Sequence, residues 1–543
     1  MPASSRSRSA SLSSGGRSLQ WPGRYAPFLL VIAVLAVYLP ASSNGFIYDD
    51  SQVILAQEAP RTPGGVARIF GERHFYNLPY YRPVTRATLL VQKSLHGADP
   101  VPFHLFNAAL AAVAALLAWR LVSVCGGPRP VLAAALFSLH PIASSCVYPV
   151  SSGRETLLPT ALTLAALIAW ISGRRGLAWL MFAAALLSKE QSVVVPALFV
   201  LADVTGISRP RPDWKNYWPL APVAIGYALI RFALFGGTEY AAGSLFGPLL
   251  SAAYAVQTIA VPFVSLHYEP PVPVWFSPVR LLAAVAVAAV VAILIRRQPP
   301  RALWFWLGWF GIALLPTANL LRQEAPYDER YVLLASLAAF ALLAAVVPAR
   351  VGIALTIVCA SISMYRARYF ADDLAFSRQW IATDPSNVNG HFNLGYGLAG
   401  LGRVAEAVEP YREAVRLKSG SALAQNNLGD ALLKTDRVDE AEPHLREAVR
   451  LDPSLPVAHY NLGLILARRN QFDAAATEFA EAIRRKPAFP EAHMNLGNVH
   501  AARGDFDAAI REFEQSLALK PDYTDARRNL DLARSLRAGK QPR

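Results

Sequence analysis

The sequence predicts an all-α protein in two parts, a polytopic bundle of membrane-spanning helices followed by a solenoid of helical hairpins. Apolar residues make up 54% of the 543 positions and charged residues 17%, which is too apolar for a soluble protein of this length. The charge is also uneven, because the stretch 281–295 carries none while the chain after residue 384 is rich in Arg, Glu, Asp and Lys. The expected domains are a cytoplasmic basic tail (1–24), a membrane domain (25–370), a linker (371–387) and a repeat domain (388–538).

The net charge of +14 does not indicate nucleic-acid binding. Much of the excess is Arg in the N-terminal tail and in loops beside apolar segments, where orientation in the bilayer explains it. No nucleic-acid-binding motif accompanies it. The three cysteines, Cys125, Cys146 and Cys359, lie in or beside apolar stretches and form neither a metal-ligand cluster nor a disulfide framework. We therefore expect them to be packing residues.

Apolar segments long enough to cross a bilayer, about 20 residues each, recur through the first two thirds of the chain. An uncleaved first helix is favoured over a cleaved signal peptide because many further spans follow it. Two shorter segments, 177–188 and 191–203, flank Lys189 and Glu190 and are expected to meet at a polar apex. The full-length candidates are 26–41, 103–124, 130–149, 155–172, 218–236, 280–295, 302–321, 331–347 and 350–365.

The positions of the basic residues predict how the helices are oriented. Four arginines in the first 24 residues place the N-terminus in the cytoplasm. If the interrupted segment 249–267 crosses the membrane, the basic cluster at 296–301 falls outside; if it dips in and returns, the cluster falls inside. The second solution gives about 11 crossings and a repeat domain outside the cytoplasm. The abundance of Arg beside only eight Lys indicates a GC-rich bacterial genome, so we expect the bacterial inner membrane.

Two adjacent carboxylates, Asp49 and Asp50, lie in the loop after the first span. In a water-poor cleft near the headgroups, a carboxylate can act as a general base. The alternative is a solvated turn with an Asx cap, and the pair alone does not decide between them.

Other ionisable and polar residues gather on the same, outer side of the membrane in this topology. Both signs of charge are present, as suits a substrate with a phosphate at headgroup level, where Arg or Lys holds the phosphate and Glu orients the cation. The alternative is that each is an ordinary residue at a helix end, with its charged tip in water. The set comprises Arg82, His104, Asn107, His140, Arg154, Glu155, Lys189, Glu190, Glu329 and Arg330.

These motifs resemble the transmembrane and tetratricopeptide-repeat O-mannosyltransferases and their bacterial relatives, in the GT-C superfamily of glycosyltransferases. The resemblance covers nearly the whole chain. It rests on motifs in the same order, namely GFIYDD (45–50), YRPVTR (81–86), FHLFN (103–107), LHP (139–141), SGRE (152–155), LLSKE (186–190) and ERYVLL (329–334).

The resemblance implies an enzyme that transfers a sugar from a polyprenyl-phosphate donor to an acceptor on the non-cytoplasmic face. It implies Asp49 or Asp50 as the catalytic base and no obligatory metal, although the doubled Asp is compatible with a divalent ion. The lipid-phosphate candidates are Arg82, Arg154, Lys189 and Arg330. The segment before the ninth helix departs from the family, since it reads Ser-Leu-His-Tyr-Glu at 265–269 where eukaryotic members commonly have Asp after Leu-Ser.

Four copies of Asn-Leu-Gly, 34 residues apart, have the period of the tetratricopeptide repeat, a helical hairpin that stacks into a superhelix. The predicted repeats are 388–421, 422–455, 456–489 and 490–523, with a closing helix at 524–538. Small Gly and Ala at fixed positions allow the two helices of a hairpin to approach closely. The bulky residues expected between those helices are Tyr411, Leu445, Phe479 and Phe513.

An Asn ladder follows the same period and is expected near the concave groove. One Asn amide can donate to and accept from a peptide unit, so the ladder could bind the acceptor polypeptide or a partner protein; it resembles the Asn ladder of the nucleocytoplasmic O-linked N-acetylglucosamine transferase. The alternative is a structural helix residue. The ladder is Asn393, Asn427, Asn461 and Asn495. A non-catalytic membrane scaffold, built around these repeats, is the rival to a glycosyltransferase.

Overall fold

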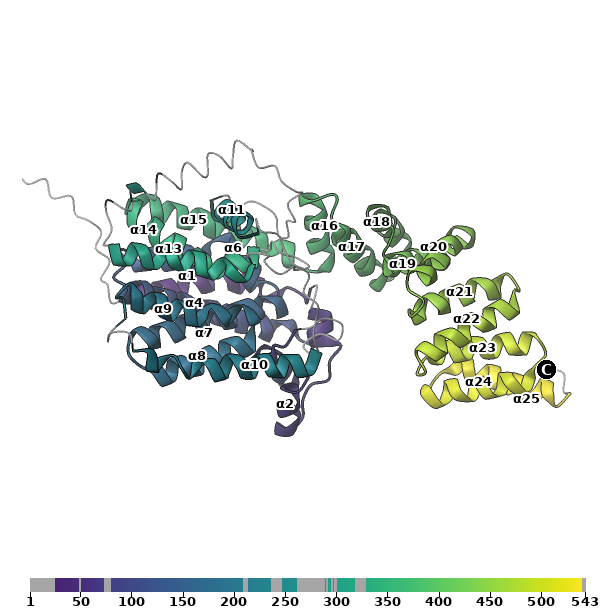
Figure 1. Cartoon of the computed structure of the whole chain (residues 1–543). Coiled ribbons are helices and arrows are strands. Elements are labelled where there is room, and N and C mark those ends of the chain that lie inside the picture. Colours follow the sequence, from purple (N-terminus) through teal and green to yellow (C-terminus); the bar gives the residue numbers. More distant parts are fainter. Residues whose placement is uncertain are drawn as a thin grey trace, which may run out of the picture. The chain divides into compact units, whose positions relative to one another are not determined.

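The computed structural model describes residues 25–47, 50–72, 80–208, 213–235, 247–260, 289, 292–293, 296, 300–317 and 329–539. Within these ranges all regular secondary structure is helical, as the sequence predicts. The chain divides into two compact units (Figure 1), and the first of them ends at Ala367. The second unit comprises the chain from Arg368 onward together with the short segment 44–51.

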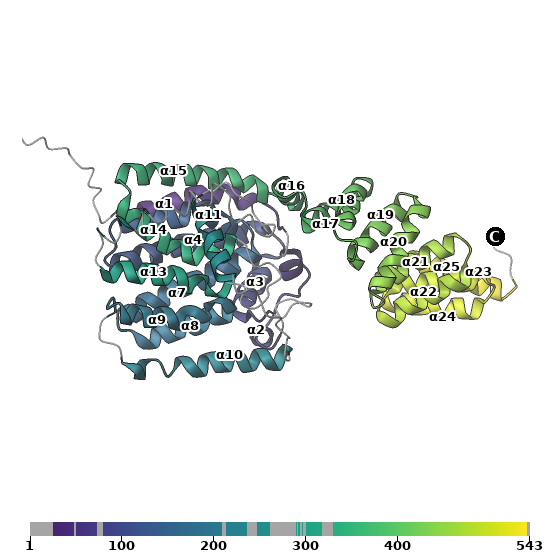
Figure 2. The ribbon, with the colours of Figure 1, turned by 45° about the horizontal axis from the view of Figure 1, so that its top comes forward.

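The first unit is a bundle of apolar helices in which α4, α7 and α8 lie side by side (Figure 2). Among the described residues, four helices are long and apolar enough to cross a membrane by themselves: Ala26–Ser43, which joins α1 to a 3-10 turn, α4 (Pro100–Val124), α7 (Ser151–Ile171) and Ala349–Phe370, which contains α15. The shorter helices are α3 (Pro83–His96), α8 (Arg175–Ser188), α9 (Val195–Val204), α10 (Leu220–Phe235), α11 (Gly247–Ala260), α13 (Pro300–Leu314) and α14 (Leu333–Val346).

The bent pair α5 (Pro130–Leu139) and α6 (Pro141–Val147), counted as one span, raises the number of candidate spans in the described part of the chain to five. The chain is therefore an integral membrane protein by helix length and composition. Most of the predicted span 280–295, and the end of the segment 249–267, lie outside the described residues, so the total of about 11 crossings stays a prediction.

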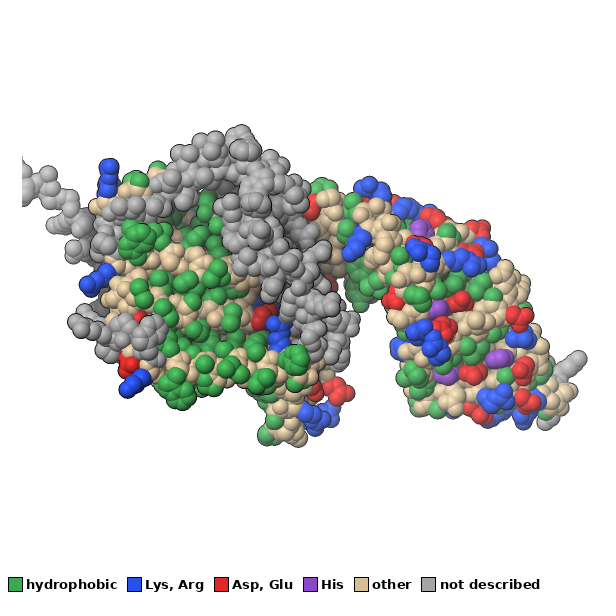
Figure 3. All heavy atoms as spheres, viewed as in Figure 1, with side chains coloured by type: hydrophobic (Ala, Val, Ile, Leu, Met, Phe, Trp, Pro, Cys, Tyr) green, Lys and Arg blue, Asp and Glu red, His purple; other side chains and the backbone are tan. Residues whose placement is uncertain are grey.

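Large apolar side chains cover the outside of this unit, and polar ones are buried within it. Phe28, Phe232 and Ile357 are each more than 60% exposed, and Figure 3 shows a broad apolar face over this part of the molecule. In contrast, Arg154 is fully buried and Lys189 is only 5% exposed. This distribution is the one expected for a unit that is surrounded by lipid.

The stretch predicted as one span, 130–149, is broken at His140. The helices α5 and α6 meet there at an angle of 57°, because Pro141 has no N–H to continue α5 and instead starts α6. The Nδ1 atom of His140 accepts a hydrogen bond from the N–H of Ile142, which caps the new helix. Three carbonyls at the break receive side-chain hydrogen bonds, from Tyr38 to Ser138, from Ser363 to Leu139 and from Arg366 to Pro141.

The second unit consists of stacked hairpins, as predicted. The predicted linker 371–387 contains an additional helix, α16 (Asp373–Thr383), which packs on the first repeat helix. The four hairpins are α17 (Val388–Gly400) with α18 (Val404–Leu417), α19 (Ala422–Lys434) with α20 (Val438–Leu451), α21 (Pro456–Arg468) with α22 (Phe472–Arg485), and α23 (Pro490–Ala502) with α24 (Phe506–Leu519); α25 (Thr524–Arg537) closes the array.

The glycine of each Asn-Leu-Gly copy faces the bulky residue of its own hairpin. A Cβ atom at Gly463 would lie 2.8 Å from the ring of Phe479, and one at Gly429 would lie 2.5 Å from Leu445. Gly395 and Gly497 stand in the same relation to Tyr411 and Phe513. The repeat signature is therefore a packing requirement, since any larger residue would push the paired helices apart.

Candidate active site

Arg82 is the centre of a buried charged cluster in the membrane unit. It precedes Pro83, the first residue of α3, and its backbone (φ −134°, ψ 58°) lies outside the helical region, which proline disfavours for the residue before it. Its guanidinium makes a two-bond pair with the carboxylate of Glu190, with Nε to Oε2 at 2.9 Å. A third N–H donates to Glu155, and the guanidinium lies over the ring of Tyr80. Two carboxylates thus surround one buried cation.

The short connection between α6 and α7, residues 148–150, forms a tight elbow that positions Glu155 near the start of α7. Gly153 lies so close to α6 that a Cβ there would be 2.5 Å from the carbonyl oxygen of Cys146. Asn107 of α4 fixes the same elbow, since its Oδ1 accepts from Arg154 Nε at 3.2 Å. The amide nitrogen of Asn107 donates to the carbonyls of Val147, Pro149 and Val150.

Arg154 and Asn107 therefore belong to the packing of α4 against the elbow. Arg154 also donates to the carbonyl of Phe103 and lies over the ring of Phe106. Because its side chain is fully buried, it points into the protein, whereas its neighbour Glu155 joins the charged cluster.

A pocket opens beside the cluster, with an empty volume of about 410 Å³ that includes its open mouth. Two cations, Lys189 and Arg330, line it together with hydroxyl and amide side chains. Lys189 follows the last residue of α8, and its ammonium donates to Thr156 Oγ1 at 3.3 Å. The remaining lining residues are Pro159, Thr160, Thr163, Gln191, Ser192, Ala313, Pro316 and Leu334.

The pocket contains residues that we did not predict from the sequence. Thr156, Thr160 and Thr163 are spaced by four and three positions, so they lie on one face of α7. The sequence does contain a signal for this side of the pocket, namely three hydroxyl residues at helical spacing within an apolar span. Gln191 and Ser192 follow the Lys189-Glu190 pair directly in the chain.

Asp50 is 1% exposed and lies in the short segment 44–51 of the second unit. Its carboxylate accepts the N–H of Ile47 at 3.0 Å, and its own N–H donates to the carbonyl of Ile47 at 3.1 Å. The carboxylate of Asp50 is therefore buried and accepts a hydrogen bond from the nearby backbone. Asp49 lies outside the described residues.

The structure brings together Arg82, Glu155 and Glu190, and it places Lys189 and Arg330 in one pocket. His140 lies elsewhere, at the α5–α6 break, where its Nε2 is 3.2 Å from the carbonyl oxygen of Ile259. His104 is buried within α4. The side chain of Glu329 lies outside the description. Among the described residues no group of three or more His, Cys, Asp or Glu is placed to hold a metal ion.

The Asn ladder bridges neighbouring hairpins. Asn461 is buried, and its amide donates to Asn426 Oδ1 of the preceding hairpin at 3.0 Å. Asn495 donates in the same way to the hydroxyl of Tyr460 at 3.1 Å. The amides of Asn461 and Asn495 thus already contribute to the stacking of repeats, and peptide binding by the ladder stays a prediction.

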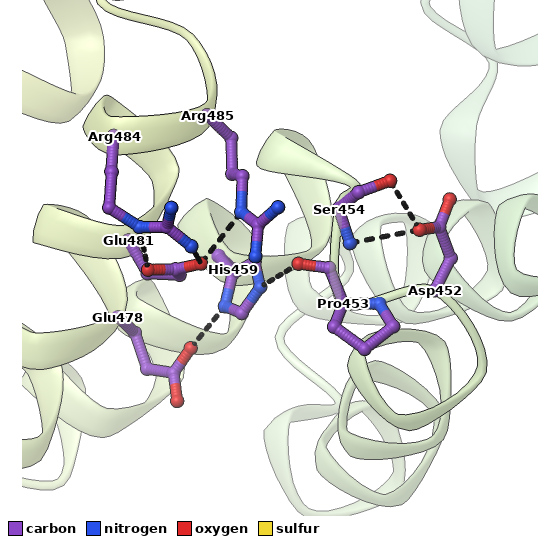
Figure 4. A network of polar contacts seen from close by, with 8 residues as sticks. All are labelled: Asp452, Pro453, Ser454, His459, Glu478, Glu481, Arg484 and Arg485. Atoms are coloured by element: carbon purple, nitrogen blue, oxygen red, sulfur yellow. Dashed lines mark hydrogen bonds and ion pairs between the residues drawn. The ribbon is translucent and has the colours of Figure 1, made fainter.

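A second periodic contact stabilises the array (Figure 4). The ring of His459 lies between Glu478, whose Oε2 is 2.7 Å from Nδ1, and the carbonyl of Pro453, 3.0 Å from Nε2. It therefore ties the two helices of one hairpin to the turn that ends the previous hairpin. His493 repeats the arrangement 34 residues later, with Glu512 and the carbonyl of Pro487.

Comparison with known proteins identifies the repeats. The tetratricopeptide repeat family model matches residues 374–422, 392–456 and 460–534. The similar solved structures include YrrB, "a TPR protein with an unusual peptide-binding site", at 23% identity, 32% of this chain, 86% of that chain and TM-score 0.27. TTC0263, a protein of Thermus thermophilus, matches at 19% identity, 34% of this chain, 95% of that chain and TM-score 0.26.

The similarity to one curated protein extends beyond the repeats. The protein O-mannosyl-transferase F38B6.6 of Caenorhabditis elegans is 24% identical over 456 residues, which cover 75% of this chain and 66% of that protein. The protein O-mannosyl-transferase TMTC3 of Mus musculus is 27% identical over 197 residues, 32% of this chain and 21% of that protein. The match thus spans slightly less than two thirds of the nematode protein and a fifth of the mouse one. The chain is a tetratricopeptide-repeat-containing homologue of the TMTC-like protein O-mannosyltransferases.

Proposed function

We propose that this protein is an integral-membrane glycosyltransferase that transfers a sugar, with mannose as the first candidate, from a polyprenyl-phosphate donor to a Ser or Thr hydroxyl of a protein. The observation that carries the proposal is the pocket lined by Lys189, Arg330 and a row of hydroxyls, beside a buried charged cluster in a unit with an apolar exterior. The similarity to proteins named O-mannosyl-transferases supports it. It is a proposal for the whole chain, including its substrates.

Lys189 and Arg330 are assigned to the lipid phosphate. Both line the pocket, and cations there would stabilise the charge that develops on the leaving phosphate. Arg82 has a different role, since Glu155 and Glu190 already accept hydrogen bonds from three of its five N–H donors. It holds these two carboxylates in place next to Lys189.

The reaction is a single displacement at the anomeric carbon of the sugar. Asp49 or Asp50 takes the proton from the acceptor hydroxyl, because a neutral hydroxyl is a weak nucleophile. The oxygen of the acceptor forms a bond to the anomeric carbon while the bond from that carbon to the phosphate oxygen breaks. The electron pair leaves with the polyprenyl phosphate, and the configuration at the anomeric carbon inverts.

The repeats are assigned to the acceptor polypeptide. The first helix of each hairpin carries Asn393, Asn427 and Asn495 in half-buried positions, while Asn461 is buried. In the proposed topology the N-terminus lies in the cytoplasm of a bacterium and the repeats lie on the periplasmic side, where a polypeptide leaving the membrane would meet them.

The test is sugar transfer by the purified protein in detergent or vesicles. Polyprenyl-phosphate mannose is supplied first, then the glucose donor, with membrane and secreted proteins as acceptors. Transfer that is lost in Asp49→Asn or in Asp50→Asn establishes the enzyme and identifies the base; transfer unaffected by both refutes that assignment. No transfer with any donor favours a membrane scaffold instead. Chelation of divalent ions is expected to leave the rate unchanged.

A further inference from the structure

The segment that follows the Asp49-Asp50 pair is a single helical turn of the wide, π type, Ser51–Leu55. Such turns are rare and recur at functional sites. Val53 and Ile54 are fully buried, so the turn is inserted into the membrane unit. The carbonyls at the end of any helical turn lack partners within that turn and need donors from elsewhere.

Lys93 supplies those donors. Its ammonium lies 2.9 Å from the carbonyl oxygen of Ile54, 2.9 Å from that of Leu55 and 2.6 Å from that of Gln57. An ammonium has three N–H groups, so each of them can be assigned to one carbonyl. A positive charge at the carbonyl end of a turn is also favourable electrostatically.

Arg86 holds the same segment from a second point. It lies seven residues, or two helical turns, before Lys93, so both side chains emerge from one face of α3. Its Nε donates to Gln57 Oε1 at 2.9 Å, and its Nη2 forms an ion pair with Glu72 at 2.8 Å. The same helix begins next to Arg82. A single rigid element therefore carries the charged cluster at one end and holds the segment 54–57 along its length.

We propose that Lys93 is a positioning residue for Asp50. By binding the three carbonyls, it fixes the end of the turn Ser51–Leu55, whose first residue is joined directly to Asp50. This inference rests on the proposed function, since it requires Asp50 to be the base. A displacement of about 1 Å in a catalytic group can reduce a rate by a factor of roughly 100.

The experiment compares Lys93→Ala and Lys93→Arg with the wild-type protein in the transfer assay. Ser94→Ala is the matched control, because Ser94 is the next residue of α3 and donates to the carbonyl of Pro60, outside the turn. We expect Lys93→Ala to reduce kcat by about 10-fold to 100-fold with the KM for the donor unchanged, because the pocket of Lys189 and Arg330 is not altered. Lys93→Arg, which keeps a multiple donor, is expected to recover most of kcat, and Ser94→Ala to retain it.

Hydrogen exchange of the peptide covering 51–57 accompanies the kinetics. Faster exchange there in Lys93→Ala, with unchanged exchange in the repeats and a reduced kcat, supports the inference. A kcat within twofold of wild type overturns it, and so does an equal loss in Ser94→Ala or a loss confined to KM. If the wild-type protein transfers no sugar from any donor, the proposed function itself fails and this role fails with it. Transfer by the wild type with unaffected variants refutes the positioning role alone.

Discussion

The guanidinium of Arg82 pairs with the carboxylate of Glu190, a residue 108 positions later in the chain, through two parallel hydrogen bonds. The Arg82 side chain is 7% exposed and also contacts Glu155, whose side chain is 8% exposed. The pair joins the start of α3 to the turn after α8, two segments that lie far apart in the sequence. Desolvated ion pairs of this kind are sensitive to the loss of one member, since the other is left buried without a counter-charge.

Arg82→Ala is expected to destabilise the membrane unit by several kcal/mol, about 3 to 5, because two buried carboxylates lose their cation. The apparent melting temperature in detergent should fall, and sugar transfer should be lost. The double variant Arg82→Ala with Glu190→Gln should recover part of the melting temperature. Arg446→Ala, at an exposed ion pair with Glu442, is the control and should change little. Equal shifts in both single variants would contradict this account.

Gly153→Ala is expected to disturb the elbow that places Glu155. A methyl group there would lie 2.5 Å from the carbonyl oxygen of Cys146, so α6 and α7 would have to separate, at a cost of about 1 to 3 kcal/mol. Transfer activity and melting temperature should both fall. Gly226→Ala in α10 is the matched control, since a Cβ there meets nothing within 4 Å. If the two variants behave alike, close packing at Gly153 is not the reason for its presence.

Gly463→Ala is expected to destabilise the repeats, because its methyl group would lie 2.8 Å from the ring of Phe479. The expected loss is about 1 to 3 kcal/mol. Hydrogen exchange of the α21–α22 peptides in the full chain measures it, and exchange in the membrane unit should stay unchanged. Gly400→Ala, where a Cβ has no neighbour within 4 Å, should leave the protein as stable as wild type or slightly more so. Unaltered exchange in Gly463→Ala would refute the packing argument.

His444 should make the second repeat less stable in acid. Burial lowers the pKa of His444, opposed by the nearby Glu440 and assisted by Arg412, and its Nδ1 lies 2.8 Å from Gln425 Oε1. A His whose folded-state pKa is lowered binds fewer protons folded than unfolded, so its contribution is complete above the unfolded pKa of about 6.5 and is lost as the pH falls through the folded value.

The measurement is hydrogen exchange of α19 and α20 as a function of pH, for the wild type and His444→Gln. The wild type should lose stability relative to the variant below about pH 6.5. Titration of the surrounding carboxylates is common to both proteins and cancels in the comparison. A difference between the two that does not change with pH would show that His444 is not the titrating group.

The repeats could be predicted almost completely from the sequence, and the structure shows why. Gly463 faces Phe479 within one hairpin, so the contact has a fixed separation in the chain and recurs every 34 residues. The helices of the membrane unit were also visible as apolar runs. The break at His140 was not predicted, because a Pro within an apolar run does not always end a helix, which can instead continue with a kink.

The charged cluster could be predicted only as a set of residues. The sequence placed Arg82, Glu155, Lys189 and Glu190 on one side of the membrane, but not the pairing of Arg82 with both carboxylates. That pairing depends on the packing of α3, α7 and α8, for which no periodic signal exists. The sequence also did not distinguish Arg154, which packs against α4, from the adjacent Glu155, which joins the cluster.

The break at His140 also bears on how the protein is made. The carbonyl of Leu139 obtains its donor from Ser363, more than 220 positions later in the chain, whereas that of Pro141 accepts from the nearby Ser144 as well as from Arg366. During synthesis the ribosome delivers α5 and α6 long before α15, and an unpaired carbonyl in hydrocarbon costs several kcal/mol. The break between α5 and α6 is therefore expected to complete its hydrogen bonds only after α15, the helix that carries Ser363, is inserted. A chain truncated before α15 should be recognised by membrane proteases as unfinished.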